Sequence, residues 1–193
     1  MNESALIVGA GSGLSASLAQ LCASRGMKVV LAARSIEKLK NLKKEIGADT
    51  IKCDATNIKS VKNLFNKTDK IIGVPNLVFY NPSKSLGGSI IDLDPKKAHE
   101  AINISCYGGF LVAQQAAIRM LKKKRGSIFF TGATASIKGF PKSSVFAMGK
   151  FGLRGLAQSL ERELHPQNTH VGHFIIDGGI GQKNYGSYKT IHP

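Results

Sequence analysis

The sequence predicts an α/β domain in which one parallel β-sheet is covered by helices on both faces. Apolar runs alternate with amphipathic stretches along the whole chain, which is typical of strands joined by helices. The apolar runs are nearly continuous, as expected for strands buried on both faces. No repeat, low-complexity stretch or linker interrupts the 193 residues, a length that suits one core. We therefore expect a single domain spanning residues 1–193.

Six apolar runs are the expected strands. In order they are ALIVGAG, MKVVLAA, DTIKC, NLVFYN, SIFFT and HVGHFIID. The first three expected helices place their apolar residues on one face; these are Leu14, Leu18, Leu21 and Cys22, then Ile36, Leu39 and Ile46, then Val61, Leu64 and Phe65.

Two long helices are expected in the second half of the chain. The first runs from about Pro95 to Leu121, because Asp94 is a good capping residue and a proline at the first helical position lacks only an amide that needs no partner. The second runs from about Ser143 to Leu164.

Composition argues for a water-soluble protein without a membrane span. The formal net charge is +15, and the KKKR run at Lys122–Arg125 could attract an anionic partner. The lysines are, however, scattered through every expected helix without interleaved aromatic residues, so nucleic-acid binding is the less favoured interpretation. No apolar run approaches the roughly 20 residues that cross a bilayer. The odd number of cysteines favours free thiols and a cytoplasmic location.

A glycine-rich turn links the first expected strand to the first helix. Gly9, Gly11, Ser12, Gly13 and Leu14 occupy it. Glycine permits a tight turn and brings a pyrophosphate close to backbone amides at the positive end of a helix. This context predicts dinucleotide binding, although an ordinary strand-to-helix turn also favours glycine.

Arg34 lies at the end of the second expected strand, about 20 residues beyond the turn. A carboxylate there would bind the ribose diol of NAD, whereas an arginine accepts the 2′-phosphate of NADP. Neither Ala33 nor Arg34 offers a carboxylate, so the sequence favours NADP(H) over NAD(H).

These motifs resemble those of the short-chain dehydrogenase/reductase family, whose turn reads TGxxxGxG. Here Ser15 stands at the third glycine. Asp54 resembles the family's adenine-contacting aspartate, and Asn81 is what remains of its NNAG motif. Gly178 and Ile180 match the turn after the sixth strand. The resemblance implies a doubly wound Rossmann fold that lacks the family's last strand and helix, as if the chain were truncated at its C-terminus. The sixth strand would then be an exposed sheet edge, with unpaired amides beside Val171 and Phe174.

The same resemblance implies a degenerate active site. The family uses an Asn-Ser-Tyr-Lys tetrad in which the tyrosine exchanges a proton with the substrate and the lysine holds the nicotinamide ribose. The tyrosine of YxxxK is Phe146 here, and Lys150 is retained. The serine position is Ala133, and the asparagine position is Ser105 rather than the nearby Asn103.

Two functions remain open at this stage. One is an NADP(H)-dependent oxidoreductase of unknown small-molecule substrate with a relocated proton donor, for which Tyr80, Tyr107, Ser105 and Thr134 are candidates. The other is a non-catalytic NADP(H)-binding pseudoenzyme that acts as a scaffold or sensor. The two long helices resemble those through which the family forms homodimers. No metal site is expected, because the histidines have no cysteines or carboxylates at ligand spacing.

Overall fold

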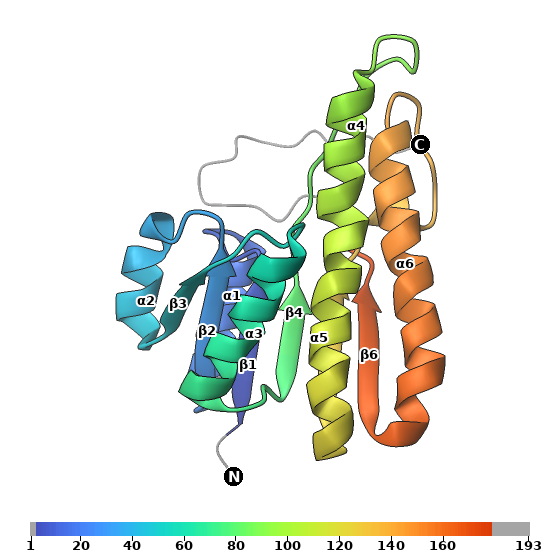
Figure 1. The fold of residues 1–193 in the computed structure, drawn as a ribbon. Helices are drawn as coiled ribbons and strands as arrows, with labels where there is room; N and C mark the ends of the chain where they lie inside the picture. The colour runs from blue at the N-terminus through green and yellow to red at the C-terminus, as the bar shows by residue number, and fades with distance from the viewer. Residues whose placement is uncertain (1–2, 179–193) are drawn as a thin grey trace.

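A computed structural model describes residues 3–178 and contains one six-stranded parallel sheet flanked by helices (Figure 1). The strand order is β3-β2-β1-β4-β5-β6, and every neighbouring pair is parallel. The strands are β1 (Ser4–Val8), β2 (Lys28–Ala33), β3 (Asp49–Lys52), β4 (Leu77–Tyr80), β5 (Gly126–Thr131) and β6 (Thr169–Phe174). The predicted fold class is thus confirmed.

The helices divide between the two faces of the sheet. They are α1 (Leu14–Ser24), α2 (Lys40–Ile46), α3 (Ile58–Ile72), α4 (Pro95–Ile102), α5 (Gly108–Lys123) and α6 (Ser144–Leu164), with short turns of helix η1 (Glu37–Leu39), η2 (Asn103–Tyr107), η3 (Thr134–Ser136) and η4 (His165–Gln167). One buried core joins the sheet to α3, α5 and α6, and a smaller one joins it to α1 and α2. In Figure 1, α5 and α6 run side by side across β4, β5 and β6.

Strand β1 lies inside the sheet, between β2 and β4. All five residues of β1 are buried, which explains why the run SALIV carries no alternation of polar and apolar residues. The chain adds β2 and β3 on one side of β1, then crosses to add β4, β5 and β6 on the other. Such a reversal opens a crevice at the carboxyl ends of the central strands, where ligands of this fold class bind.

The long helix that begins at Pro95 differs from the sequence prediction in its middle. Asp94 caps it as expected, accepting hydrogen bonds from the amides of Lys96 and Lys97 at 2.7 and 3.4 Å. Between α4 and α5, however, η2 is a wider π-helical turn. The buried Tyr80 hydroxyl donates to the Ile104 carbonyl at 2.5 Å there, which satisfies an oxygen inside the widened turn.

Strand β6 forms an edge of the described sheet, as the sequence predicted. The face of β5 and β6 opposite α5 and α6 carries Phe129, which contacts Phe174 at 5.3 Å between ring centroids, and Phe174 is 53% exposed. One expectation for this edge was wrong. The Val171 amide is not unpaired, because it donates to Glu161 Oε2 at 2.6 Å. Among the described residues, no helix is long and apolar enough to cross a membrane.

Removing the Tyr80 hydroxyl is expected to destabilise the π-helical turn. Tyr80→Phe should lower the free energy of unfolding by about 1–2 kcal/mol, because the Ile104 carbonyl loses a buried donor. Chemical denaturation measures this value. Tyr107→Phe makes the same chemical change at a side chain that is 39% exposed, and it should change stability by less than about 0.5 kcal/mol. Equal effects of the two substitutions would contradict the structural role of Tyr80.

Candidate functional site

A cleft of about 520 Å³ opens at the carboxyl ends of β1, β2, β3 and β4. It lies where the strand order reverses, as expected for a ligand site in a doubly wound sheet. Six of the residues singled out from the sequence line it, namely Gly9, Gly11, Ser12, Arg34, Asp54 and Asn81. Gly13 and Leu14 lie directly behind its wall, at the N-cap and first residue of α1. The amino end of a helix therefore faces this part of the cleft.

Gly9 is fixed as glycine by two independent features of the turn. Its φ is +80°, a conformation that side chains with a Cβ rarely adopt. A Cβ at this position would also lie 2.7 Å from the backbone nitrogen and ring of Pro82, in the loop after β4. Asn81 lies in the same loop, and its side-chain amide approaches the Gly9 carbonyl at 3.5 Å. The glycine turn and the β4 loop therefore form one packed wall of the cleft.

Ser15 shows how the incomplete glycine motif is accommodated. Its hydroxyl accepts a hydrogen bond from the Gly11 amide at 2.9 Å and donates to the Gly9 carbonyl at 3.3 Å. The serine is only 2% exposed and bridges the two ends of the turn. The side chain that replaces the third glycine therefore stiffens the turn, but it also occupies one of the amides that face a phosphate in such turns.

Positive charge gathers at the mouth of the cleft beside β2. Arg34 and Lys38 both line it, one helical turn apart in sequence. The Asp54 carboxylate lies across the cleft and accepts hydrogen bonds from the amide and hydroxyl of Thr56 at 2.9 and 2.8 Å. Sequence reasoning missed Lys38 and Thr56. The four-residue spacing from Arg34 could have found Lys38, whereas nothing in the sequence marked Thr56.

Lys150 lies on α6 and is buried against the end of β5. It is not among the residues that line the cleft. Its side chain is 2% exposed, and Nζ donates to the Thr131 carbonyl at 2.8 Å. Burial lowers the pKa of Lys150 from its ordinary 10.5 to about 8, because an apolar surrounding disfavours the charged amine. The Phe146 ring lies one helical turn earlier on α6, with its centroid 5.7 Å from Nζ. Ala133 lies two residues after the end of β5, at the N-cap of η3.

His173 is a second titratable group near Lys150, and the sequence placed it only within the sixth expected strand. Its Nε2 lies 3.4 Å from Ser136 Oγ, in the helical turn that follows Ala133. Burial lowers the pKa of His173, and the positive charges of Lys150 and Arg154 lower it further. The Ser136 hydroxyl also accepts from the Ala133 amide at 3.1 Å. An imidazole and a hydroxyl thus lie directly behind the position of the missing serine.

Three of the four candidate proton donors named from the sequence form hydrogen bonds within the fold. Burial strongly raises the pKa of Tyr80, whose hydroxyl is bound inside the π-helical turn. The Ser105 hydroxyl accepts from the Lys84 amide at 3.1 Å, and Thr134 donates to the Asp177 carboxylate at 2.6 Å. Tyr107 is partly exposed and stacks on Phe110. Gly178 is the last described residue, and Ile180 lies outside the described residues.

Comparison with known proteins agrees with this arrangement. The family model for short chain dehydrogenases matches residues 3–180. The chain belongs to this family. It is 30% identical over 173 residues to a protein of Euphorbia lathyris named short chain aldehyde dehydrogenase 1, and the match covers 86% of this chain and 60% of the relative. It is 31% identical over 173 residues to an uncharacterized oxidoreductase of Staphylococcus aureus, covering 86% of this chain and 74% of that protein.

Solved structures show the same fold. A short-chain dehydrogenase from Rhodopseudomonas palustris superposes with a TM-score of 0.85 and 34% identity, over 91% of this chain and 84% of that one. An actinorhodin polyketide ketoreductase solved with NADPH has a TM-score of 0.86 over 89% of this chain and 69% of its own. At 24% identity, the ketoreductase supports the fold alone. As a member of the short-chain dehydrogenase family, the chain has the fold of an NAD(P)-binding oxidoreductase.

The buried lysine should make stability depend on alkaline pH. The folded state releases the Lys150 proton near pH 8 and the unfolded state near pH 10.5, so between these values the unfolded chain binds more protons. Stability contributed by this group therefore rises with pH across that window, by up to about 3 kcal/mol. The measurement is the free energy of unfolding of the native chain minus that of Lys150→Met, at pH 7 to 10.5. A difference that stays flat or falls would show that Lys150 is not held in a desolvated position.

Proposed function

We propose that this chain binds NADP(H) in the cleft at the carboxyl ends of β1, β2, β3 and β4 and is an oxidoreductase of the short-chain dehydrogenase family with a degenerate active site. The observation that carries the proposal is the pair of cations at the mouth of the cleft. Arg34 and Lys38 lie beside β2, where the ribose end of a dinucleotide reaches in this fold class, and no carboxylate stands at the end of β2. Two cations can pair with the 2′-phosphate of NADP. No carboxylate at this position is available to accept hydrogen bonds from the ribose diol of NAD.

The remainder of the cleft offers contacts for the rest of the dinucleotide. The Gly9 turn and the amino end of α1 provide a positive wall for the pyrophosphate. Asp54 stands at the adenine end, and Asn81 lies in the loop that leads toward Lys150. We assign to Lys150 the role of holding the nicotinamide ribose, because its Nζ is fixed by Thr131 and has further donors to offer. NADPH, when bound, supplies the hydride.

Reduction of a carbonyl also needs a proton, and here the ordinary carriers are missing. Phe146 and Ala133 lack the oxygens that would deliver the proton and orient the substrate. General acid–base transfer is worth about 10²–10⁴-fold in rate, so ordinary carbonyl reduction should be very slow. If a substrate is turned over, it is a small carbonyl compound whose proton comes from another group near Lys150.

The second candidate function is an NADP(H)-binding pseudoenzyme that works as a sensor or scaffold. Two observations favour it. Phe146 and Ala133 each lack the oxygen of the family's tyrosine and serine but have nearly the same shape as those side chains. In addition, the candidate donors Tyr80, Ser105 and Thr134 are hydrogen-bonded within the fold. Cofactor binding is common to both functions. The three cysteines, Cys22, Cys53 and Cys106, are free thiols, which suits the reducing cytoplasm that we propose as the location.

Cofactor preference should depend on Arg34. Titration with NADPH and NADH, followed by fluorescence, should show tighter binding of NADPH. Arg34→Ala should weaken NADPH binding by about 10–100-fold, because a charge-assisted hydrogen bond to phosphate is worth about 1.5–3 kcal/mol. NADH binding should change little. Arg25→Ala removes a comparably exposed arginine at the far end of α1 and is the matched control. Equal affinities for the two cofactors, unaffected by Arg34→Ala, would overturn the assignment.

Restoring the two missing oxygens should restore activity. Phe146→Tyr combined with Ala133→Ser is expected to raise NADPH-dependent reduction of aldehydes and ketones by about 10²–10⁴-fold over the native chain. The same pair of substitutions with Lys150→Met is the control and should stay inactive. Robust turnover by the native chain would show that the family mechanism does not apply to this protein. So would activity of the double variant that is unchanged by Lys150→Met.

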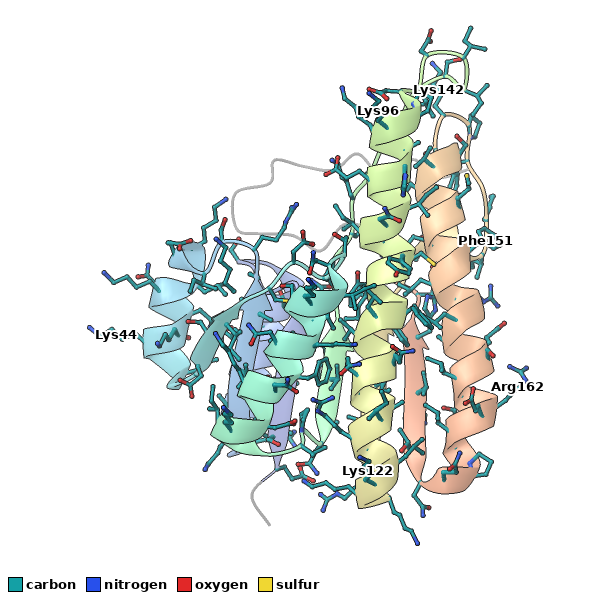
Figure 2. All side chains as sticks on the ribbon, viewed as in Figure 1. Lys44, Lys96, Lys122, Lys142, Phe151 and Arg162 are labelled. Carbon is teal, nitrogen blue, oxygen red and sulfur yellow. The ribbon has the colours of Figure 1, made fainter. Side chains whose placement is uncertain are left out.

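We also propose a homodimer formed through α5 and α6. Their outer faces expose large apolar side chains that the sheet does not cover, namely Phe110, Met148 and Phe151, and Tyr107 of η2 stacks on Phe110. Figure 2 shows Phe151 on α6, while the labelled Lys44, Lys96 and Lys122 project from three different helices and form no single basic face. This distribution favours self-association through an apolar face over binding of nucleic acid.

A charge placed within this face should break the dimer. Phe151→Asp is expected to shift the native species to a monomer in sedimentation equilibrium, because the 44%-exposed ring would be buried against the second copy. Ile91→Asp places the same charge at an 88%-exposed side chain in the loop before α4 and should leave the dimer intact. A native chain that sediments as a monomer would refute the proposal directly.

A further inference from the structure

A polar cluster lies at the opposite end of the sheet from the nucleotide cleft. Glu161 is in the last two turns of α6, His165 begins η4, and His170 is the second residue of β6. The two imidazoles border a hollow of about 370 Å³ beside the first residues of β5 and β6. The nucleotide cleft opens at the carboxyl ends of the strands, so the two sites do not share residues.

Both histidines direct a ring nitrogen at the same carboxylate. His165 Nδ1 lies 3.1 Å from Glu161 Oε1, and His170 Nδ1 lies 3.5 Å from Glu161 Oε2. One ligand atom from each of the three residues falls within 4.8 Å of the others. In a tetrahedral zinc site with bonds of about 2.0–2.2 Å, neighbouring ligand atoms are about 3.3–3.5 Å apart. Small side-chain rotations therefore suffice to bring the three atoms onto one ion.

The cluster is held in place before any ion arrives. The Val171 amide donates to Glu161 Oε2 at 2.6 Å, which fixes the carboxylate and leaves Oε1 toward His165. The His170 ring packs edge-on against Phe129, with centroids 5.8 Å apart. Glu161 and His165 are four residues apart and so share one helix face. Fixed partners behind the ligands are what well-formed metal sites use to orient them.

The local charge also favours a cation. The carboxyl end of α6 carries the negative end of the helix dipole, and Glu161 adds a full negative charge. The basic Arg162 of the same turn donates to the Gln158 carbonyl. Arg125 borders the same hollow, but its guanidinium pairs with Glu3 at 2.8 Å. No metal site was expected from the sequence, although Glu161 stands one helical turn before His165. The fold adds what the sequence spacing does not show, because the chain returns through β6 and brings His170 to the same carboxylate.

We propose that Glu161, His165 and His170 bind one divalent transition-metal ion, with zinc as the expected physiological occupant. Two imidazoles and a carboxylate suit Zn²⁺, and the fourth position faces the open hollow and takes water. The ion joins the end of α6 to the edge strand β6. It therefore acts as a structural clamp on the helix that carries Lys150 and should stabilise the folded chain.

The test uses the 193-residue chain with any affinity tag removed and bound metal stripped with a chelator. Calorimetric titration with ZnCl₂ should give one equivalent, and saturating Zn²⁺ should raise the melting temperature. Each of His165→Gln and His170→Gln should weaken binding by at least about tenfold. Both side chains are mostly exposed, at 70% and 55%, so these variants should fold. His99→Gln removes an exposed histidine from α4 and should bind zinc as the native chain does.

Co²⁺ gives an independent readout, because tetrahedral coordination by these ligands produces visible absorption bands that Zn²⁺ should displace. The absence of zinc binding by the folded native chain would overturn the proposal. So would binding that persists unchanged in both histidine variants, since the ion would then sit elsewhere, for example on the free thiols. If neither occurs and only His99→Gln leaves binding intact, the site is assigned.

Discussion

The positions of the functional side chains all depend on the complete burial of β1. This strand contributes five buried residues and pairs with β2 on one side and β4 on the other. Because both neighbours run parallel to it, the loops after β1, β2 and β4 emerge at one edge of the sheet. The glycine turn, Arg34 and Asn81 then share a cleft even though they lie far apart in the sequence. A polar substitution inside β1 would disturb its pairing with β2 and β4, and with it the positions of the glycine turn, Arg34 and Asn81.

Lys150 is the residue whose retention most needs explanation. Lowering the pKa of its amine from 10.5 to about 8 corresponds to about 3 kcal/mol of destabilisation at neutral pH. Within the described residues no carboxylate forms an ion pair with it, and a methionine could fill the same space without this cost. A buried lysine with one hydrogen bond to a carbonyl and no ion pair is better explained by a contact with a ligand. This argument supports cofactor binding, and it holds whether or not any catalysis survives.

Much of the fold could be predicted because its signals are local. Continuous apolar runs indicated buried strands, and Asp94-Pro95 marked a helix start that the structure confirms. The π-helical turn could not be predicted, because it depends on the Tyr80 hydroxyl reaching Ile104 from another element. The same limit applies to the site. Glycines and Arg34 follow a linear motif, whereas the Ser136–His173 contact joins residues 37 positions apart. Long-range pairs of this kind carry no sequence period.

Glu161 illustrates how one side chain can serve both the edge of the sheet and a site. An edge amide needs a partner, and the carboxylate supplies one to Val171 without adding a strand. The same bond leaves the second oxygen free to meet His165. One orientation of the Glu161 carboxylate therefore serves both the Val171 amide and His165. The two roles differ in what they need from the side chain, because the Val171 amide needs only an oxygen acceptor whereas a cation also needs the negative charge. Glu161→Gln keeps an oxygen acceptor and removes the charge, so it should preserve the edge contact and weaken metal binding.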